Sequence, residues 1–335
     1  MAQVGHLPFY LDDKRVEVVA VAEERPSLQR ALADRLGQKR VVASHNALLA
    51  RSDIDAVVIC APRPATGPLT LQALQSGKHV LAEKPMAHTV EQARKLVETA
   101  RTNKLLYEIG FMKLFDPGVQ VAKRQLLQLR NDGTLGRLLS ARFFDFSASY
   151  AVAPPAHVRP QESREIRYPT WPTHPAWLAE QYRGTYEWFL NAASHDVSLL
   201  RCFFPGTVTV IGADSPNDGA ISAVLRCDRV ALTLEIAKTS AGHWIEGAEF
   251  LFERGRLALT IPSPMASDSV GSVTLDDPAR GLAGHLLATE NGWCFARQAA
   301  AFIDTLLGCG NTDAAGEQGL ADLMLIENIW RRIQE

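Results

Sequence analysis

The sequence lacks the features that mark several large classes of protein. Its five cysteines are scattered and show neither a Cys-x-x-Cys motif nor a Cys/His ligand spacing, so the sequence predicts no disulfide framework and no metal site. No apolar run approaches the roughly 18 residues of a membrane span, and the start of the chain shows no signal-peptide pattern. A net charge of −2 provides no field that attracts nucleic acid or anionic lipid. We therefore expect a cytoplasmic protein that binds neither nucleic acid nor membranes.

The first third of the chain alternates between predicted strands and predicted helices. Runs of β-branched or other apolar residues, which suit strands buried on both faces, occupy residues 16–22, 54–60, 78–82 and 105–109. Helical patterns lie between them at residues 27–36, 69–75 and 89–101. This alternation predicts a doubly wound parallel sheet within a first domain, residues 1–114.

The remainder of the chain, residues 115–335, has a different pattern. Helices are predicted at residues 117–129, 188–203, 293–307 and 317–332. Between the second and third of them, successive strands separated by Asn-Asp-Gly, Asp-Arg and Arg-Gly turns occupy residues 207–275. Strands joined in succession by tight turns predict a large, mostly antiparallel sheet. At 335 residues the chain is long enough for two domains, each with its own core.

Two groups of polar residues carry the chemistry that the sequence suggests. Glu83-Lys84-Pro85 directly follows the predicted strand at residues 78–82. Asn191 and His195 lie four residues apart in a predicted helix, so both side chains project from the same helix face. An amine, an amide and an imidazole in this arrangement indicate proton transfer at a carbon that bears a hydroxyl or a carbonyl group.

Several motifs follow one another in a characteristic order. They are a buried strand that ends in Glu23, Ile54-Asp55-Ala56-Val57-Val58-Ile59, Gly77-Lys78-His79-Val80, Glu83-Lys84-Pro85, Gly110-Phe111-Met112-Lys113-Leu114-Phe115-Asp116-Pro117 and the helix with Asn191 and His195. In this order they resemble the Gfo/Idh/MocA family, named after glucose–fructose oxidoreductase and inositol dehydrogenase. The resemblance implies a Rossmann domain and a C-terminal α/β domain whose open sheet forms a homodimer or homotetramer contact. It also implies NAD or NADP as cofactor and a sugar, cyclitol or related small molecule as substrate.

The resemblance gives the two polar groups their roles. Lys84 matches the lysine that hydrogen-bonds the reacting hydroxyl and the cofactor ribose, and Pro85 fixes the turn that presents it, often after a cis peptide bond. Glu83 supports that turn. His195 matches the histidine that acts as acid/base or binds substrate. Asn191 stands where the family often has Asp, so it can orient the imidazole of His195 without charging it.

Further residues are expected to bind the cofactor or the substrate. A carboxylate at Glu23, where the second Rossmann strand ends, would bind the adenosine ribose diol of NAD, whereas Arg25 would meet the 2′-phosphate of NADP. Pro62 ends the next buried strand at the cofactor side. On the substrate side we place Lys113, Tyr182 and Tyr186, although packing in the core is an alternative role for both tyrosines.

One element of the family pattern is absent from the sequence. The family has a strand and a glycine-rich GxGxxG turn before the first helix, and that turn lets the pyrophosphate approach the helix N-terminus. Here residues 2–8 resemble that first helix, with no such strand or turn before it. Two explanations are open. The start site is misplaced or the chain was truncated, or the strand and the glycine-rich turn have been lost naturally. For the chain as it stands, we expect a Rossmann-like sheet without its first strand and weak or no binding of NAD(P).

These observations leave three functional hypotheses. The leading one is an NAD(P)-dependent oxidoreductase in which Lys84 and His195 handle the proton. The second is a non-redox acid/base enzyme on the same fold, such as a lyase, isomerase or cyclase, which the absent glycine turn suggests. The third is a non-catalytic sugar-sensing or interaction protein, which the Asn at position 191 suggests.

Overall fold

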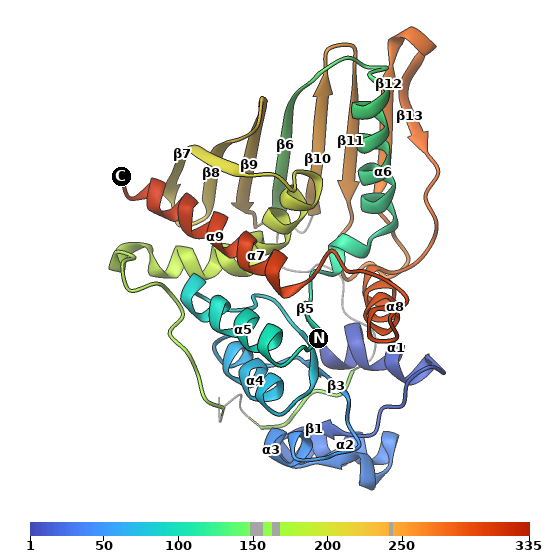
Figure 1. The fold of residues 1–335 in the computed structure, drawn as a ribbon, viewed down its shortest axis with the longest axis vertical. Coiled ribbons are helices and arrows are strands. Elements are labelled where there is room, and N and C mark those ends of the chain that lie inside the picture. The colour runs from blue at the N-terminus through green and yellow to red at the C-terminus, as the bar shows by residue number, and fades with distance from the viewer. Residues whose placement is uncertain (148–156, 163–167, 241–243) are drawn as a thin grey trace.

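The computed structural model describes residues 1–335 except 148–156, 163–167 and 241–243. Figure 1 shows a large sheet in the upper half of the molecule and a smaller α/β part, formed by the start of the chain, in the lower half. Two long helices, α7 (Arg183–Phe203) and α9 (Gly316–Ile333), lie between these halves. Among the described residues, no helix combines the length and the apolar character needed to cross a membrane.

The first part of the chain forms parallel strands that alternate with helices, as predicted. The strands are β1 (Val21–Ala22), β2 (Val41–Val42), β3 (Ala56–Ile59), β4 (His79–Ala82) and β5 (Tyr107–Ile109). The helices are η1 (Ala2–His6), α1 (Leu7–Asp12), α2 (Pro26–Leu36), η2 (Gln38–Arg40), α3 (His45–Leu49), α4 (Arg63–Gln75) and α5 (Val90–Thr102). β1 pairs with β2, while β3, β4 and β5 form a second parallel sheet in that order. Within the described residues, no strand joins these two sheets.

The strand predicted at residues 16–22 is shorter in the structure, where β1 comprises Val21 and Ala22. Residues 16–20 are half-buried or exposed and belong to no strand. The apolar run predicted a strand buried on both faces over residues 16–22, but β1 pairs with β2 along two residues. A strand extends only as far as a neighbour satisfies its backbone groups, so the pattern alone overstated its length.

The second part of the chain forms an eight-stranded sheet in the order β13-β12-β11-β10-β6-β9-β8-β7. Its strands are β6 (Leu138–Ser147), β7 (Val208–Asn217), β8 (Ala220–Cys227), β9 (Val230–Lys238), β10 (Trp244–Phe252), β11 (Gly255–Ile261), β12 (Ser272–Asp277) and β13 (Leu282–Leu287). Neighbouring strands run antiparallel except β6 and β9, which are parallel. The prediction of a large, mostly antiparallel sheet is confirmed.

Helices cover one face of this sheet. α7 packs against β6 and β9, α9 packs against β7, and α6 (Pro117–Asp132) packs against β11 and β12. The carboxylate of Asp116 caps α6 by accepting a hydrogen bond from the Gly118 amide at 2.8 Å. α6 ends at Gly133, whose φ of +65° is the left-handed conformation typical of a helix end. α8 (Cys294–Leu306) lies beside α1 and η3 (Met112–Phe115).

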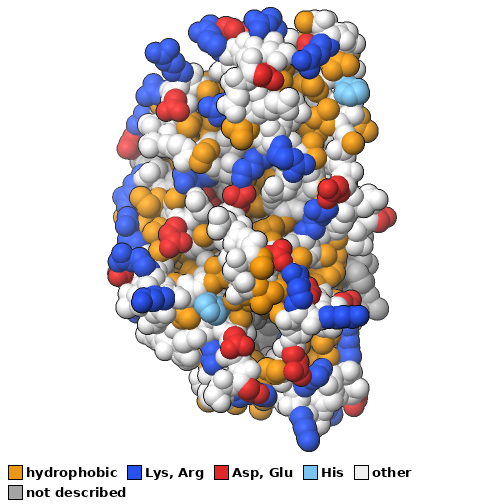
Figure 2. All heavy atoms as spheres, turned by 45° about the vertical axis from the view of Figure 1, so that its right-hand side comes forward, with side chains coloured by type: hydrophobic (Ala, Val, Ile, Leu, Met, Phe, Trp, Pro, Cys, Tyr) orange, Lys and Arg blue, Asp and Glu red, His pale blue; other side chains and the backbone are white. Residues whose placement is uncertain are grey.

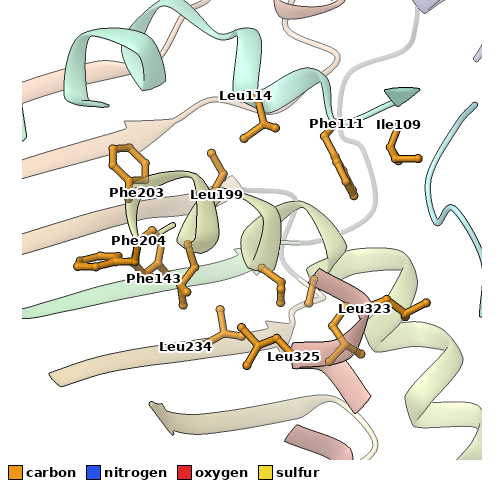
Figure 3. Packing of buried hydrophobic residues seen from close by; sticks show 14 of the residues in the cluster. Ile109, Phe111, Leu114, Phe143, Leu199, Phe203, Phe204, Leu234, Leu323 and Leu325 are labelled. Carbon is orange, nitrogen blue, oxygen red and sulfur yellow. The ribbon is translucent and has the colours of Figure 1, made fainter. Parts of the chain in front are cut away.

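One continuous core joins the two halves of the molecule. Figure 3 shows Phe143 of β6 beside Phe203 and Phe204, which come from the end of α7. The ring of Phe143 lies 6.0 Å from that of Phe203 and 6.2 Å from that of Phe204. The same cluster continues to Phe111 and Ile109 at the end of β5. This packing holds α7 in a defined place relative to the carboxyl ends of β4 and β5.

The face of the large sheet that the helices leave uncovered is mixed in character. Exposed apolar side chains on it include Val224, Ile245 and Leu251. Ion pairs lie among them, such as Arg142 with Glu235 at 2.8 Å. The face of the molecule shown in Figure 2 also has hydrophobic side chains among charged side chains of both signs. Neither sign of charge dominates, in agreement with the small net charge.

Candidate active site

The candidate site lies where the carboxyl ends of β3 and β4 meet the middle of α7. Ligand sites of doubly wound proteins lie at this edge because strand ends and helix N-termini converge there. Lys84 follows β4, and its Nζ donates a hydrogen bond to the backbone oxygen of Asn191 at 2.6 Å. The Oδ1 of Asn191 lies 3.3 Å from the same Nζ. The Lys84–Pro85 peptide bond is cis, as the family resemblance implied.

The environment of Lys84 favours its neutral amine more than water does. Burial, assisted by the nearby charges of Lys113 and Arg63, lowers the pKa of Lys84 to about 8 against the opposing effect of Glu83. A lysine in this range can release and recover a proton near neutral pH, which a fully exposed lysine cannot. The side chain is therefore suited to acid/base chemistry.

His195 lies on the same face of α7 as Asn191 and is buried, with 6% of its surface exposed. Burial lowers the pKa of His195 well below its usual range, and the positive charges of Lys84 and Lys113 act in the same direction. Its Nδ1 has no hydrogen-bond partner within the described residues, and its ring meets that of Phe111 edge-on at 6.0 Å. This environment favours the neutral imidazole of His195 at neutral pH.

Glu83 is tied to a residue that sequence reasoning did not connect with it. The Nε2 of His6 lies 2.7 Å from Oε1 of Glu83, and both side chains are largely buried. The other oxygen of Glu83, Oε2, accepts from the backbone amide of Lys84 at 3.3 Å. Glu83 thus supports the turn that presents Lys84, which is its predicted role. No local pattern connects His6 with Glu83, because 77 residues separate them.

A group of buried charges surrounds Lys113, which belongs to η3. The Nζ of Lys113 donates to Oε1 of Glu246 at 2.6 Å and lies 5.3 Å from the centre of the Trp244 ring. Asp196 and Asp145 are also buried and interact electrostatically with Lys113. Burial opposes the charge of Lys113, but these carboxylates outweigh it and raise its pKa. We call Lys113, Asp145, Asp196 and Glu246 the buried charge cluster.

The three carboxyl groups of the buried charge cluster share one lysine. Burial raises the pKa of Glu246 to about 7, and the neighbouring Asp145 contributes in the same direction. Burial and Asp145 also raise the pKa of Asp196 well above its usual range. One ammonium compensates one carboxylate, so the cluster retains protons at neutral pH.

The sequence does contain a signal for this cluster that the prediction missed. Glu246 lies on the same face of β10 as the buried residues Ala248 and Phe250. Asp145 pairs with Glu246 in the register of β6 and β10. Two acidic residues at inward positions of apolar strands are unusual enough to predict a buried polar site.

The residues expected to bind the adenosine part of a dinucleotide lie together at the end of β1. Arg25 donates from Nε to Oε1 of Glu23 at 2.7 Å and from Nη2 to Oε2 at 2.8 Å. Burial would raise the pKa of Glu23, but the bonds from Arg25 outweigh it and lower that pKa. Pro62 stands at the N-terminal cap of α4, just after β3.

This donor set fits a nicotinamide dinucleotide. Glu23 offers a carboxylate for a ribose diol, Arg25 offers a cation, and Lys84 offers an amine at the neighbouring strand end. Such a cofactor accepts or donates a hydride when it is bound. Within the described residues, no group of three or more His, Cys, Asp and Glu side chains is arranged to hold a metal ion.

Tyr182 and Tyr186 pack in the aromatic core around Trp330. Tyr186 is fully buried, and its hydroxyl donates to the backbone oxygen of His88 at 2.6 Å. Both tyrosine rings pack against Trp330, at 6.0 Å for Tyr182 and 5.6 Å for Tyr186. α7 begins at Arg183, earlier than predicted, so Tyr186 lies within the helix. The structure therefore favours the packing role that the sequence left as an alternative.

Replacing Tyr186 by phenylalanine tests that role. The change removes the donor to His88 and keeps the ring, so we expect the free energy of unfolding to fall by about 1 kcal/mol. KM for the substrate is expected to stay unchanged, because the hydroxyl is already engaged in the core. Denaturant unfolding and steady-state kinetics measure the two quantities. A raised KM with unchanged stability would instead show that Tyr186 contributes to substrate binding.

The sequence and the fold were compared with those of known proteins. A sequence profile described as "Oxidoreductase family, NAD-binding Rossmann fold" matches residues 1–111. A dTDP-3,4-didehydro-2,6-dideoxy-alpha-D-glucose 3-reductase from Saccharopolyspora spinosa is 32% identical over 259 residues, which cover 76% of this chain and 69% of that protein. An enzyme of the same name from Actinomadura kijaniata is 34% identical over 162 residues, covering 48% of this chain and 44% of that protein. The match to the latter relative thus spans less than half of its length.

A solved structure shows the same fold over nearly the whole chain. It is the crystal structure of a 3-ketoreductase from Actinomadura kijaniata with NADP and TDP-benzene. Its TM-score is 0.71 at 23% sequence identity, and the alignment covers 97% of this chain and 92% of that one. The parallel α/β part and the large mixed sheet are therefore arranged as in that protein.

Proposed function

This chain belongs to the Gfo/Idh/MocA family of oxidoreductases, and on that basis we propose that it transfers a hydride between NAD or NADP and a sugar, cyclitol or related polyhydroxylated small molecule. The observation that carries the proposal is the contact of the Lys84 amine with Asn191, on the helix face that also presents His195, at the carboxyl end of β4. The two relatives described above are named as 3-reductases of a dideoxyglucose nucleotide. They support a ring carbon that carries a hydroxyl or keto group as the reacting centre.

Lys84 would handle the proton of the reaction. When an alcohol is oxidised, a proton must leave its oxygen as the hydride leaves its carbon, so a base must lie within hydrogen-bond reach. The neutral amine of Lys84 would accept that proton, and its ammonium would return it to the carbonyl oxygen in the reverse direction. Asn191 holds the amine in place through its backbone oxygen at 2.6 Å.

His195 would act as a neutral hydrogen-bonding group. Its lowered pKa keeps the imidazole uncharged at neutral pH, and its buried Nδ1 has no hydrogen-bond partner within the described residues. With one donor and one acceptor nitrogen, a neutral imidazole can orient a polyhydroxylated ring beside Lys84. Glu23, Arg25, Pro62, Glu83 and Pro85 would form the cofactor side of the site, and Lys113 would border the substrate side.

Two further features belong to the proposal. We place the boundary between the cofactor domain and the substrate domain at residue 114, close to the end of the family match at residue 111. We also propose a cytoplasmic homodimer or homotetramer formed through the uncovered face of the large sheet. The exposed apolar residues Val224, Ile245 and Leu251 on this face support such a contact. Light scattering of the purified chain gives its mass directly, and a monomer at all concentrations would contradict the assembly.

A panel of keto sugars and cyclitols offered with NADH or NADPH tests the activity. The expected result is oxidation of the reduced dinucleotide that depends on one class of substrate and saturates with it. Energy transfer from the six tryptophans to the bound reduced dinucleotide measures cofactor binding separately. A folded protein that binds the dinucleotide but turns over no substrate would leave the cofactor assignment standing and contradict the substrate class.

The pH dependence of the reaction follows from the pKa of Lys84. In the oxidation direction the neutral amine is the active form, so kcat/KM is expected to rise as the pH rises through about 8. Asn191→Asp places a carboxylate 3.3 Å from the amine while the backbone contact remains. The carboxylate favours the ammonium form of Lys84, so the midpoint of the pH profile of kcat/KM is expected to shift to higher pH by about one unit.

Asn191→Leu is the matched control, because it removes the amide without adding a charge. Its pH profile is expected to keep the same midpoint as the wild-type profile. Identical midpoints for Asn191→Asp and the wild-type protein would show that Lys84 is not the group that titrates.

A further inference from the structure

A thiol, an imidazole and a carboxylate meet on the cofactor side of the site, where none of the three is assigned to the chemistry of Lys84. Cys60 follows β3, and Glu83 follows β4. The last residues of these parallel strands, Ile59 and Ala82, are register partners. The Glu83 amide then donates to the Ile59 oxygen at 2.9 Å. The register therefore places Cys60 and Glu83 side by side at the same edge.

His6 joins these two side chains. Its Nε2 lies 2.7 Å from Oε1 of Glu83, and its ring interacts electrostatically with Cys60. His6 is 3% exposed, whereas Cys60 is half-buried and so retains contact with solvent. A nucleophile beside a base that a third group orients is the geometry of an activated nucleophile.

The charge state of His6 agrees with that geometry. Burial opposes protonation of His6, but Cys60 and Glu83 outweigh it and raise its pKa to about 10. The ring is therefore an imidazolium at neutral pH, and its Nε2–H donates to Glu83. A positive imidazolium beside a sulfur stabilises the thiolate, which is the form that attacks electrophiles.

We propose that Cys60 is the reactive thiol of this protein, activated by His6 and open to covalent modification by small electrophiles. In that step the Cys60 sulfur attacks the electrophilic carbon, a sulfur–carbon bond forms, and the bond to the leaving group breaks. The leaving group departs with the electron pair, and the thiol proton is released to solvent. This proposal is independent of the substrate and cofactor of the enzyme, since it concerns a property of the chain alone.

The other four cysteines provide internal references. Cys309 is exposed, and its thiol donates weakly to the Leu307 oxygen at 3.6 Å. Burial raises the pKa of Cys202 to about 11 and that of Cys294 to about 12. Burial also raises the pKa of Cys227. These last three thiols are expected to react slowly in the folded protein, and their labelling would report loss of the fold.

Timed labelling of the full chain with iodoacetamide at neutral pH tests the proposal. Digestion and mass spectrometry then give a separate rate for each cysteine. Cys60 is expected to react about tenfold faster than Cys309, although it is the less exposed of the two. In denaturant the two rates are expected to become equal, because the imidazolium is no longer held beside the sulfur. A Cys60 that reacts no faster than Cys309 in the folded protein overturns the proposal.

The His6→Gln variant distinguishes activation of the Cys60 thiol by His6 from simple exposure of the thiol to the reagent. Glutamine can keep a hydrogen bond to Glu83 but carries no charge, so the rate at Cys60 is expected to fall about tenfold while the rate at Cys309 stays the same. An unchanged rate at Cys60, with Cys227 and Cys294 still protected, contradicts activation by His6. If the variant exposes those two thiols and has lost its fold, the comparison of Cys60 with Cys309 in the wild-type protein decides the matter.

Discussion

Replacing Lys84 by methionine is expected to lower kcat/KM by about 10²- to 10⁴-fold and to leave the fold intact. Methionine keeps the length and the apolar stem of lysine but has no proton to give or accept. The bond from Lys84 to the Asn191 oxygen is lost as well, yet that oxygen lies at a half-buried position where water can replace the amine. Steady-state kinetics and thermal unfolding measure the two effects separately.

Two variants sharpen this test. Lys84→Arg keeps a positive charge but cannot release a proton at accessible pH, so activity is expected to fall nearly as far as with methionine. Lys78 is the matched control, because it is a buried lysine at the start of the same strand whose Nζ donates to the Arg51 and Ile54 oxygens at 2.8 and 2.7 Å. Lys78→Met is expected to lower stability and leave kcat unchanged. Full activity in Lys84→Met would remove Lys84 from the reaction.

Replacing Lys113 by methionine is expected to lower the free energy of unfolding by about 3–5 kcal/mol at neutral pH. Lys113 is the cation on which the buried charge cluster depends, and its removal leaves Glu246 without the partner at 2.6 Å. Asp145 and Asp196 lose the same compensating charge. Urea unfolding monitored by circular dichroism measures the loss.

The pH dependence of that loss identifies its cause. In the variant the buried carboxyl groups hold their protons more tightly in the folded state than in the unfolded state. The free energy of unfolding therefore falls as the pH rises from the pKa of these groups in the unfolded state to their higher pKa in the folded state. The variant is therefore expected to be more stable at about pH 5.5 than at about pH 8. Adding Glu246→Gln to Lys113→Met is expected to recover part of the loss, since it removes the uncompensated charge. A pH-independent loss would indicate lost packing instead.

The sequence predicted those parts of the fold and the site that local patterns determine. Alternating strands and helices predicted the parallel part, and turn signals predicted the antiparallel sheet. Lys84 was found because Glu83-Lys84-Pro85 follows a buried strand, and Asn191 and His195 were paired by their helical spacing. Each of these inferences depends on residues that are close together in the chain.

What the sequence did not predict depends on residues that are far apart. His6 meets Glu83 across 77 residues, and Lys113 meets Glu246 across 133. Such contacts are set by the register of strands and the packing of helices, which no local period encodes. The predicted length of β1 was also wrong, because a neighbouring strand determines how far a strand extends.

The transfer of an isotope from the cofactor to the substrate tests directly whether this protein transfers a hydride. The reduced dinucleotide is labelled with deuterium at the transferring position and incubated with the protein and an active keto sugar in ordinary water. Deuterium is expected on the ring carbon of the alcohol product, with far slower transfer by Lys84→Met. A product that carries hydrogen from water at that carbon, formed without oxidation of the dinucleotide, would contradict hydride transfer and show a non-redox acid/base enzyme.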